Sequence, residues 1–162
     1  MLVSSKHLSL ASPVFRKLLN SKLLEGEALR INKCLDLALP EDDVYAFSLI
    51  MKIVHLRNNS LPSTVSLSTL TSLAVLVDKY EFHESVTAWA GPWAAKVSKA
   101  PLHYRNEFAY WICVCWVFGL SDKFAKITAG ASKQLRSTGI YGGLGAERLS
   151  NILPIPLSIT SK

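Results

Sequence analysis

One strand-like segment stands among a series of short helical patterns, and this imbalance constrains the fold more than any other feature. In CLDLAL, residues 34 to 39, leucines alternate with other residues, which predicts a strand with one apolar face. No other segment carries an equally convincing strand pattern. Because a lone strand cannot satisfy its edges or bury its face, it needs partner strands. The sequence therefore predicts a predominantly α-helical α+β fold with a reduced sheet.

Apolar residues at helical spacing predict the helices around this strand. Ser12 offers an N-cap oxygen and Pro13 suits the first helical position, so a short helix follows a first helical turn around residues 8–11. Pro40 is expected to begin another helix that runs to about residue 56. Further helices are expected over 70–80 with a cap at 66 or 68, over 86–93 with a kink at Gly91-Pro92, and over 102–118 and 121–136.

The composition is that of a chain that can bury a core. It has 162 residues, of which 49% are hydrophobic. Its most apolar segment, residues 108–120, is shorter than the roughly 20 residues that cross a bilayer, so a core helix is expected and no membrane contact. No secretory signal pattern is present, and three cysteines (Cys34, Cys113 and Cys115) favour free thiols in a reducing compartment. The expected location is intracellular, in the cytoplasm or the nucleus.

The net charge of +6 comes entirely from the second part of the chain. Residues 1–95 hold nine basic and nine acidic residues, whereas residues 96–162 hold nine basic residues against three acidic ones. The basic residues are scattered singly, which favours a solvated helical surface over nucleic-acid binding. A basic adaptor that binds nucleic acid through residues 96–162 remains the alternative function.

Several short motifs, in order, resemble the BTB/POZ family, especially its fungal members. The resemblance covers residues 3–95, and residues 96–162 resemble the helical extension behind the fungal domains. The entry helices, the strand-to-helix junction and two later helix ends carry the match, at Val3, Ser5, Leu8, Ser12, Phe15, Leu37, Pro40, Phe47, His55 and Asp78-Lys79-Tyr80.

The resemblance implies a small sheet flanked by helices and a role as a protein-interaction module. Family members are often homodimers, and some recruit a cullin-type ubiquitin ligase scaffold, so ubiquitin-ligase adaptor function is one option. In the family a β-hairpin precedes the segment that starts here at Val3, so a BTB/POZ-like cluster without its N-terminal hairpin is expected. The resemblance places a possible cullin-type contact at Leu23 and Glu25, but such triplets are common, and a solvated glutamate beside a core leucine is the favoured interpretation.

The apolar side of the first two helices is the expected protein interface, for a second copy or another protein. Without the hairpin, this face and the 34–39 strand should be more exposed than in a complete domain, and exposed edges attract partners. The expected interface residues are Leu8, Leu10, Val14, Phe15 and Leu18.

No catalytic, metal or cofactor site is expected. The four histidines are far apart in sequence, and Cys113 and Cys115 lie roughly 200° apart on a helix, so they cannot share one metal. Glu41, Asp42 and Asp43 are explained by the N-terminal dipole of the helix after Pro40. The chain contains no nucleotide-binding or nucleophile motif. We therefore expect a protein that is not an enzyme, with no cofactor and no small-molecule substrate.

Overall fold

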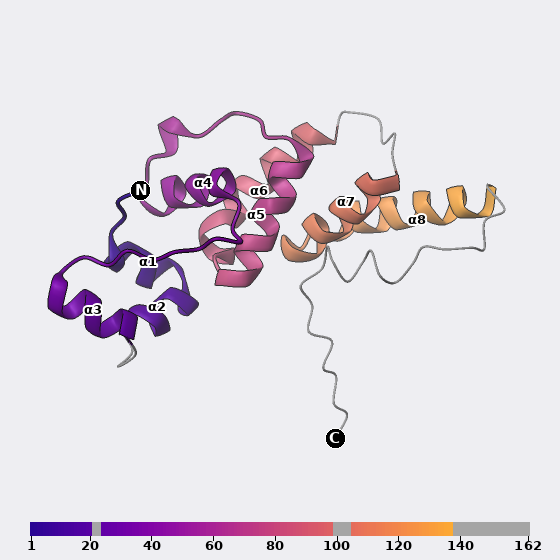
Figure 1. Ribbon diagram of the computed structural model, residues 1–162. Helices are drawn as coiled ribbons and strands as arrows, with labels where there is room; N and C mark the ends of the chain where they lie inside the picture. The colour runs from indigo at the N-terminus through magenta and orange to yellow at the C-terminus, as the bar shows by residue number, and fades with distance from the viewer. Residues whose placement is uncertain (21–23, 99–104, 138–162) are drawn as a thin grey trace, which may run out of the picture.

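The computed structural model describes residues 1–20, 24–98 and 105–137, with the side chains of 105–106 and 131–137 left out. The described part is helical, with a chain path that passes from α1–α3 through α4–α6 to α7 and α8 (Figure 1). The elements are α1 (Ser5–Ala11), α2 (Pro13–Asn20), α3 (Leu24–Asn32), α4 (Val44–Val54), a 3₁₀ turn (Asn58–Ser60), α5 (Leu67–Tyr80), α6 (His83–Val97), α7 (Arg105–Val117) and α8 (Ser121–Ser137).

Most of the predicted helices are confirmed, including two of their caps. Pro13 is the first residue of α2, and the hydroxyl of Ser12 accepts a hydrogen bond from the backbone N–H of Phe15 at 3.0 Å. Ser66, rather than Ser68, is the N-cap of α5, because its side chain accepts from the Thr69 N–H. The helix over 83–97 continues through Pro92 as one element.

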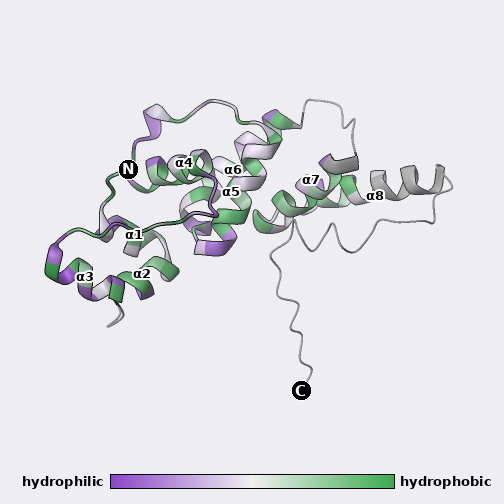
Figure 2. Cartoon of the chain, in the orientation of Figure 1, coloured by the Kyte–Doolittle hydropathy of each residue, from purple (hydrophilic) through white to green (hydrophobic). Residues whose placement is uncertain are grey.

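Helix α5 lies at the centre of the hydrophobic core. It packs against α4, α6 and α7, and α8 packs against α7. Figure 2 shows hydrophobic residues in α2, α5 and α7. Phe15 of α2 reaches α5 directly, with its ring stacked on that of Tyr80 at 4.9 Å between centroids. One continuous core therefore joins the first helices to the last.

The predicted strand at 34–39 is wrong for the described part of the chain, which contains no β-strand. The segment has no regular secondary structure and leads from α3 toward α4 (Figure 1). Alternating leucines favour a β-strand, but a strand forms only where a partner strand completes its hydrogen-bond ladder. We call these residues the 34–39 segment.

Two helix starts also differ from expectation. Pro40 does not begin α4: residues 40–42 form a turn, and α4 starts at Val44 with Asp43 as its N-cap. The Asp43 carboxylate accepts from the Ala46 N–H at 2.8 Å, and a side-chain cap of this kind defines a helix start more strongly than a proline does. Helix α3 was not predicted, because Gly26 and a weak apolar stripe hide it in the sequence.

The second part of the chain packs onto the first. Trp111, Val114 and Phe118 of the apolar segment at 108–120 are buried in the common core. No helix in the described ranges combines the length and apolar character needed to cross a bilayer. The proposed division between residues 95 and 96 stays a prediction, and α6 runs across it to Val97.

Candidate interaction site

The structure separates the five residues predicted to form an interface. Leu8 and Phe15 are buried, at 6% and 1% exposure, and belong to the hydrophobic core. Val14 and Leu18 are half-buried beside that core, whereas Leu10 is 77% exposed. The apolar stripe of the first two helices is therefore used mainly inside this chain, and Leu10 is the member that solvent reaches.

The residues predicted to contact a cullin-type scaffold are placed only in part. Leu23 lies outside the described residues, and Glu25 is a half-buried residue in the first turn of α3. An acidic side chain there interacts favourably with the helix dipole, which accounts for Glu25 without a partner.

An open apolar groove runs beside the 34–39 segment. We call it the N-terminal groove: a hollow of about 540 Å³ between residues 1–3, the first three helices and the 34–39 segment. Leu8 and Phe15 line it together with the leucines of the segment, at 35, 37 and 39. Of the five predicted interface residues, Leu8 and Phe15 line this groove. Leu10 instead lines two other hollows, one next to α3 and one next to α6.

Along most of its length, the backbone of the 34–39 segment has no hydrogen-bond partner among the residues that the structure describes. No backbone N–H or C=O of residues 34–38 bonds to another described residue, and the Leu39 carbonyl accepts only from the Asp42 N–H in the following turn, at 3.2 Å. Cys34, Asp36 and Ala38 are exposed, whereas Leu35 and Leu39 are half-buried against the groove. Beside the N-terminal groove, the segment thus combines an apolar face with a backbone, over residues 34–38, that bonds to no other described residue.

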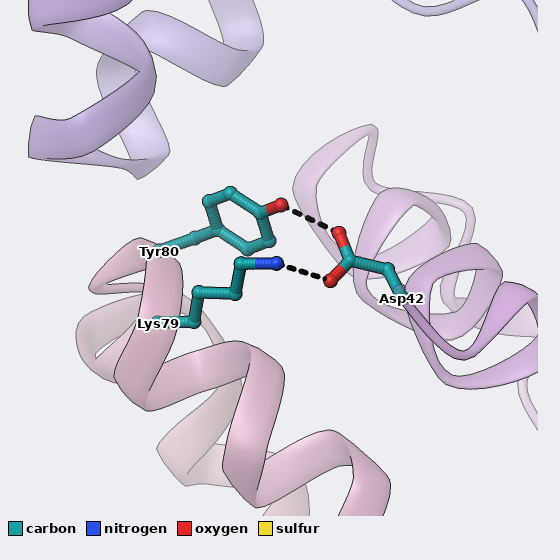
Figure 3. A network of polar contacts seen from close by, with 3 residues as sticks. All are labelled: Asp42, Lys79 and Tyr80. Carbon is teal, nitrogen blue, oxygen red and sulfur yellow. Dashed lines mark hydrogen bonds and ion pairs between the residues drawn. The ribbon is translucent and has the colours of Figure 1, made fainter. Parts of the chain in front are cut away.

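A polar network fixes the end of this segment to α5. The Asp42 carboxylate accepts from the Tyr80 hydroxyl at 2.5 Å and forms an ion pair with the Lys79 ammonium at 2.7 Å (Figure 3). The hydrogen bond from Lys79 to Asp42 raises the pKa of Lys79, although its partial burial opposes the shift. Burial, and then the hydrogen bond to Asp42, raises the pKa of Tyr80. The turn after the 34–39 segment is therefore tied to the core.

The other boundaries of the groove are also held in place. Lys33 adopts a left-handed conformation, with φ of 60°, and its N–H bonds to the Leu29 carbonyl at 3.0 Å, which closes α3 just before the segment. On the opposite side, the Ser4 N–H donates to His55 Nε2 at 2.9 Å. His55 Nδ1 lies 2.8 Å from the Met51 carbonyl, as expected for a histidine that bonds the terminal carbonyls of a helix.

The chain has no recognisable relative in the comparisons made. It matches no family model, no curated protein and no solved structure. The function therefore has to be argued from the geometry of the groove and from the sequence itself.

Two basic residues of the second part make contacts within the described part of the chain. The Lys96 ammonium bonds to the Ser63 carbonyl at 2.6 Å, and the Lys123 ammonium lies 3.6 Å from the centroid of the Trp111 ring. Burial lowers the pKa of Lys123. Two of these cations thus serve intramolecular contacts, and of the seven other basic residues in 96–162 only Lys126 has a side chain that the structure describes.

Chemically reactive residues are dispersed in the described part of the chain. No group of three or more histidine, cysteine or acidic side chains there has the geometry to hold a metal. Cys113 and Cys115 are both buried in the core, whereas Cys34 is exposed. Burial, with a smaller effect of Asp78, raises the pKa of Cys113 to about 11, so this thiol stays protonated near neutral pH.

Sequence reasoning missed the role of Asp42. It treated three consecutive acidic residues as a single helix-dipole feature. In the structure Asp43 caps α4 and also accepts from the Ser72 hydroxyl of α5 at 3.3 Å, whereas Asp42 binds the C-terminal end of α5. Glu41 is exposed, and its side chain has no polar partner among the described residues. Asp43 can be recognised as the cap because it directly precedes the first residue of α4. No local signal in the sequence identifies the long-range partners of Asp42.

Proposed function

We propose that this chain is a protein-interaction module of the BTB/POZ type that binds its partner through the N-terminal groove and acts without catalysis. The observation that carries the proposal is the combination of an apolar groove with a backbone, over residues 34–38, that has no hydrogen-bond partner among the described residues. A groove of this kind offers both parts of strand recognition: main-chain hydrogen bonds for affinity and side-chain pockets for specificity.

The anchored ends of the 34–39 segment support the same proposal. The Asp42 network and the closed end of α3 hold both ends of the 34–39 segment before any partner binds. A segment ordered in advance loses less conformational entropy on binding, which leaves more of the contact energy as affinity. Recruitment of a cullin-type scaffold is an additional option from the family resemblance, and the groove does not depend on it.

The test measures whether the groove is open to an apolar ligand in the full chain. We expect an environment-sensitive dye, anilinonaphthalene sulfonate, to bind the folded protein and to fluoresce several-fold less with Leu37→Asp, which places a charge in the groove. The matched control is Val44→Asp: Val44 is 83% exposed and does not line the groove, so the same substitution should leave dye binding unchanged.

Circular dichroism must first show that both variants keep the helical content of the parent. If the parent binds no dye in its folded state, or if both variants reduce binding equally, the groove is not an accessible binding surface and the proposed function is wrong.

A further inference from the structure

We propose that the contact between Ser4 and His55 is a pH-sensitive device, which holds one wall of the N-terminal groove in place at neutral pH and releases it in mild acid. The contact joins the start of α1 to the end of α4, across 51 positions of the sequence. Residues 1–3, which directly precede it, line the groove. The effect on binding rests on the proposed function, whereas the release of residues 1–4 does not.

The two partners of His55 fix the protonation state of its ring. Nδ1 lies 2.8 Å from the Met51 carbonyl oxygen, which only accepts hydrogen bonds, so Nδ1 carries a proton. Nε2 lies 2.9 Å from the backbone nitrogen of Ser4, whose N–H donates, so Nε2 carries no proton. The ring is therefore neutral, in a single tautomer, whenever both bonds are present.

A proton on Nε2 is incompatible with the contact to Ser4. It would place two N–H donors face to face, so that a repulsion replaces the hydrogen bond. The bond from Nδ1 to Met51 survives, because an imidazolium still donates there and a positive charge is favourable at the C-terminus of a helix. Protonated His55 thus stays on α4 and loses its bond to Ser4.

A second histidine strengthens the response to acid. The ring of His7, in α1, is stacked on the His55 ring, with 5.0 Å between the centroids and 27° between the planes. Neutral rings pack favourably in this arrangement, whereas two imidazolium rings at this distance repel each other. His7 is exposed, so protons reach it directly from the solvent. Acid therefore separates the start of α1 from the end of α4 at two neighbouring points.

The charged groups around the two rings do not stabilise them in the protonated form. On the elements packed against the end of α4, and on that end itself, the other titratable or charged groups are Lys6 of α1, Lys52, Arg57, Asp78, Lys79 and Tyr80 of α5, and His83, Glu84 and Lys96 of α6. The 3₁₀ turn contributes none. No ion pair joins either ring to a carboxylate within the described ranges. The closed arrangement therefore has no counter-ion for an imidazolium.

The start of α1 depends strongly on the contact with His55. Helix α1 has seven residues, and its N-cap, Ser4, makes no side-chain capping bond to any described residue. The Ser4 carbonyl accepts from the Leu8 N–H at 3.1 Å, a bond inside the first turn. Leu8 itself is buried in the core and keeps α1 attached. The release is therefore confined to residues 1–4 and leaves the helix in place.

Nitrogen-15 relaxation of the full chain tests the release. We expect backbone order parameters of about 0.85 for Val3 and Ser4 at about pH 7.5, and values below about 0.6 at about pH 5, because imidazole side chains change charge between these two conditions. The order parameters of α5 should stay unchanged, which distinguishes a local release from general unfolding.

Three variants identify the groups that take up the protons. His55→Gln places an amide oxygen near the position of Nε2; it accepts from the Ser4 N–H but does not titrate, so Val3 and Ser4 should stay ordered at both pH values. His55→Ala has no acceptor, so these residues should be mobile at both. His7→Phe keeps a stacked ring without a charge, so the release should depend less steeply on pH.

Circular dichroism must first show that each variant keeps the helical content of the parent. The proposal is wrong if Val3 and Ser4 of the parent stay ordered at about pH 5, or if His55→Gln releases them as the parent does. An equally steep release in His7→Phe contradicts the contribution of His7.

Dye binding separates a failure of this inference from a failure of the proposed function. At about pH 5 we expect the parent to bind anilinonaphthalene sulfonate several-fold more weakly than His55→Gln does, because the parent has lost one wall of the groove. Equal binding by the two proteins, with residues 1–4 released in the parent, contradicts the control of the groove by pH. If the parent binds no dye even at about pH 7.5, the proposed function is wrong, and the order parameters alone decide the release.

Discussion

Replacing Ser12 by alanine should destabilise this protein more than the loss of an ordinary helix cap. The Ser12 side chain is fully buried, and its hydroxyl makes two hydrogen bonds at once. It accepts from the Phe15 N–H at 3.0 Å and donates to the Tyr80 carbonyl at 2.5 Å. One atom therefore caps α2 and ties it to the C-terminus of α5.

The magnitude follows from the two bonds taken separately. Loss of an N-cap side chain costs about 1 kcal/mol. A buried carbonyl left without a donor costs roughly another 1–3 kcal/mol, because no water replaces the hydroxyl at a fully buried position. We expect Ser12→Ala to lower the free energy of unfolding by about 3 kcal/mol in total.

The assay is urea unfolding of the full chain, followed by circular dichroism and by tryptophan fluorescence. Ser66→Ala is the matched control, since Ser66 caps α5 through the Thr69 N–H but is exposed, and water can replace its hydroxyl. The free energy of unfolding of this control variant should fall by about 1 kcal/mol or less. If Ser12→Ala is no more destabilising than Ser66→Ala, the long-range bond to α5 does not contribute and the reasoning is refuted.

Two further predictions concern protonation and thiol reactivity. Lys79 and Tyr80 both have raised pKa values in the folded state. Their protonated forms therefore add to the free energy of unfolding below about pH 10, and this stabilisation is lost as the pH rises above it. Thermal unfolding between pH 8 and pH 12 should show this loss, and Asp42→Asn should weaken it; an identical pH profile in the variant would contradict the assigned network. Ellman's reagent at pH 8 should label the exposed Cys34 in the native protein, whereas Cys113 should react only after unfolding. Rapid native labelling of more than one thiol would disprove the buried position of the α7 cysteines.

Much of the helical structure could be predicted because its signals are local. The Ser12-Pro13 pair defines the start of α2 from side-chain geometry and a fixed φ angle, and the structure has both features. Helix α3 escaped prediction because it contains Gly26 and lacks a strong apolar stripe. Its position depends on packing against α2, which is a tertiary contact.

The candidate site could be predicted only in outline. The apolar pattern identifies Leu8 and Phe15 as residues that must be buried, but it does not say whether a partner or the chain itself buries them. The structure shows that the chain does, since Phe15 stacks on Tyr80, which is 65 residues later in the sequence. The open surface lies instead beside the 34–39 segment.

The sequence by itself determined the helical periodicity, the cap at Ser12, a cap at Ser66 or Ser68, and the alternation of leucines between residues 34 and 39, because each depends on residues a few positions apart. Only the tertiary structure decided which apolar residues remain accessible and which helix-α5 residues pair with Asp42 and Asp43. It also decided that no strand of the described residues pairs with the 34–39 segment, since pairing depends on which segments lie beside it and a local pattern cannot provide a neighbour.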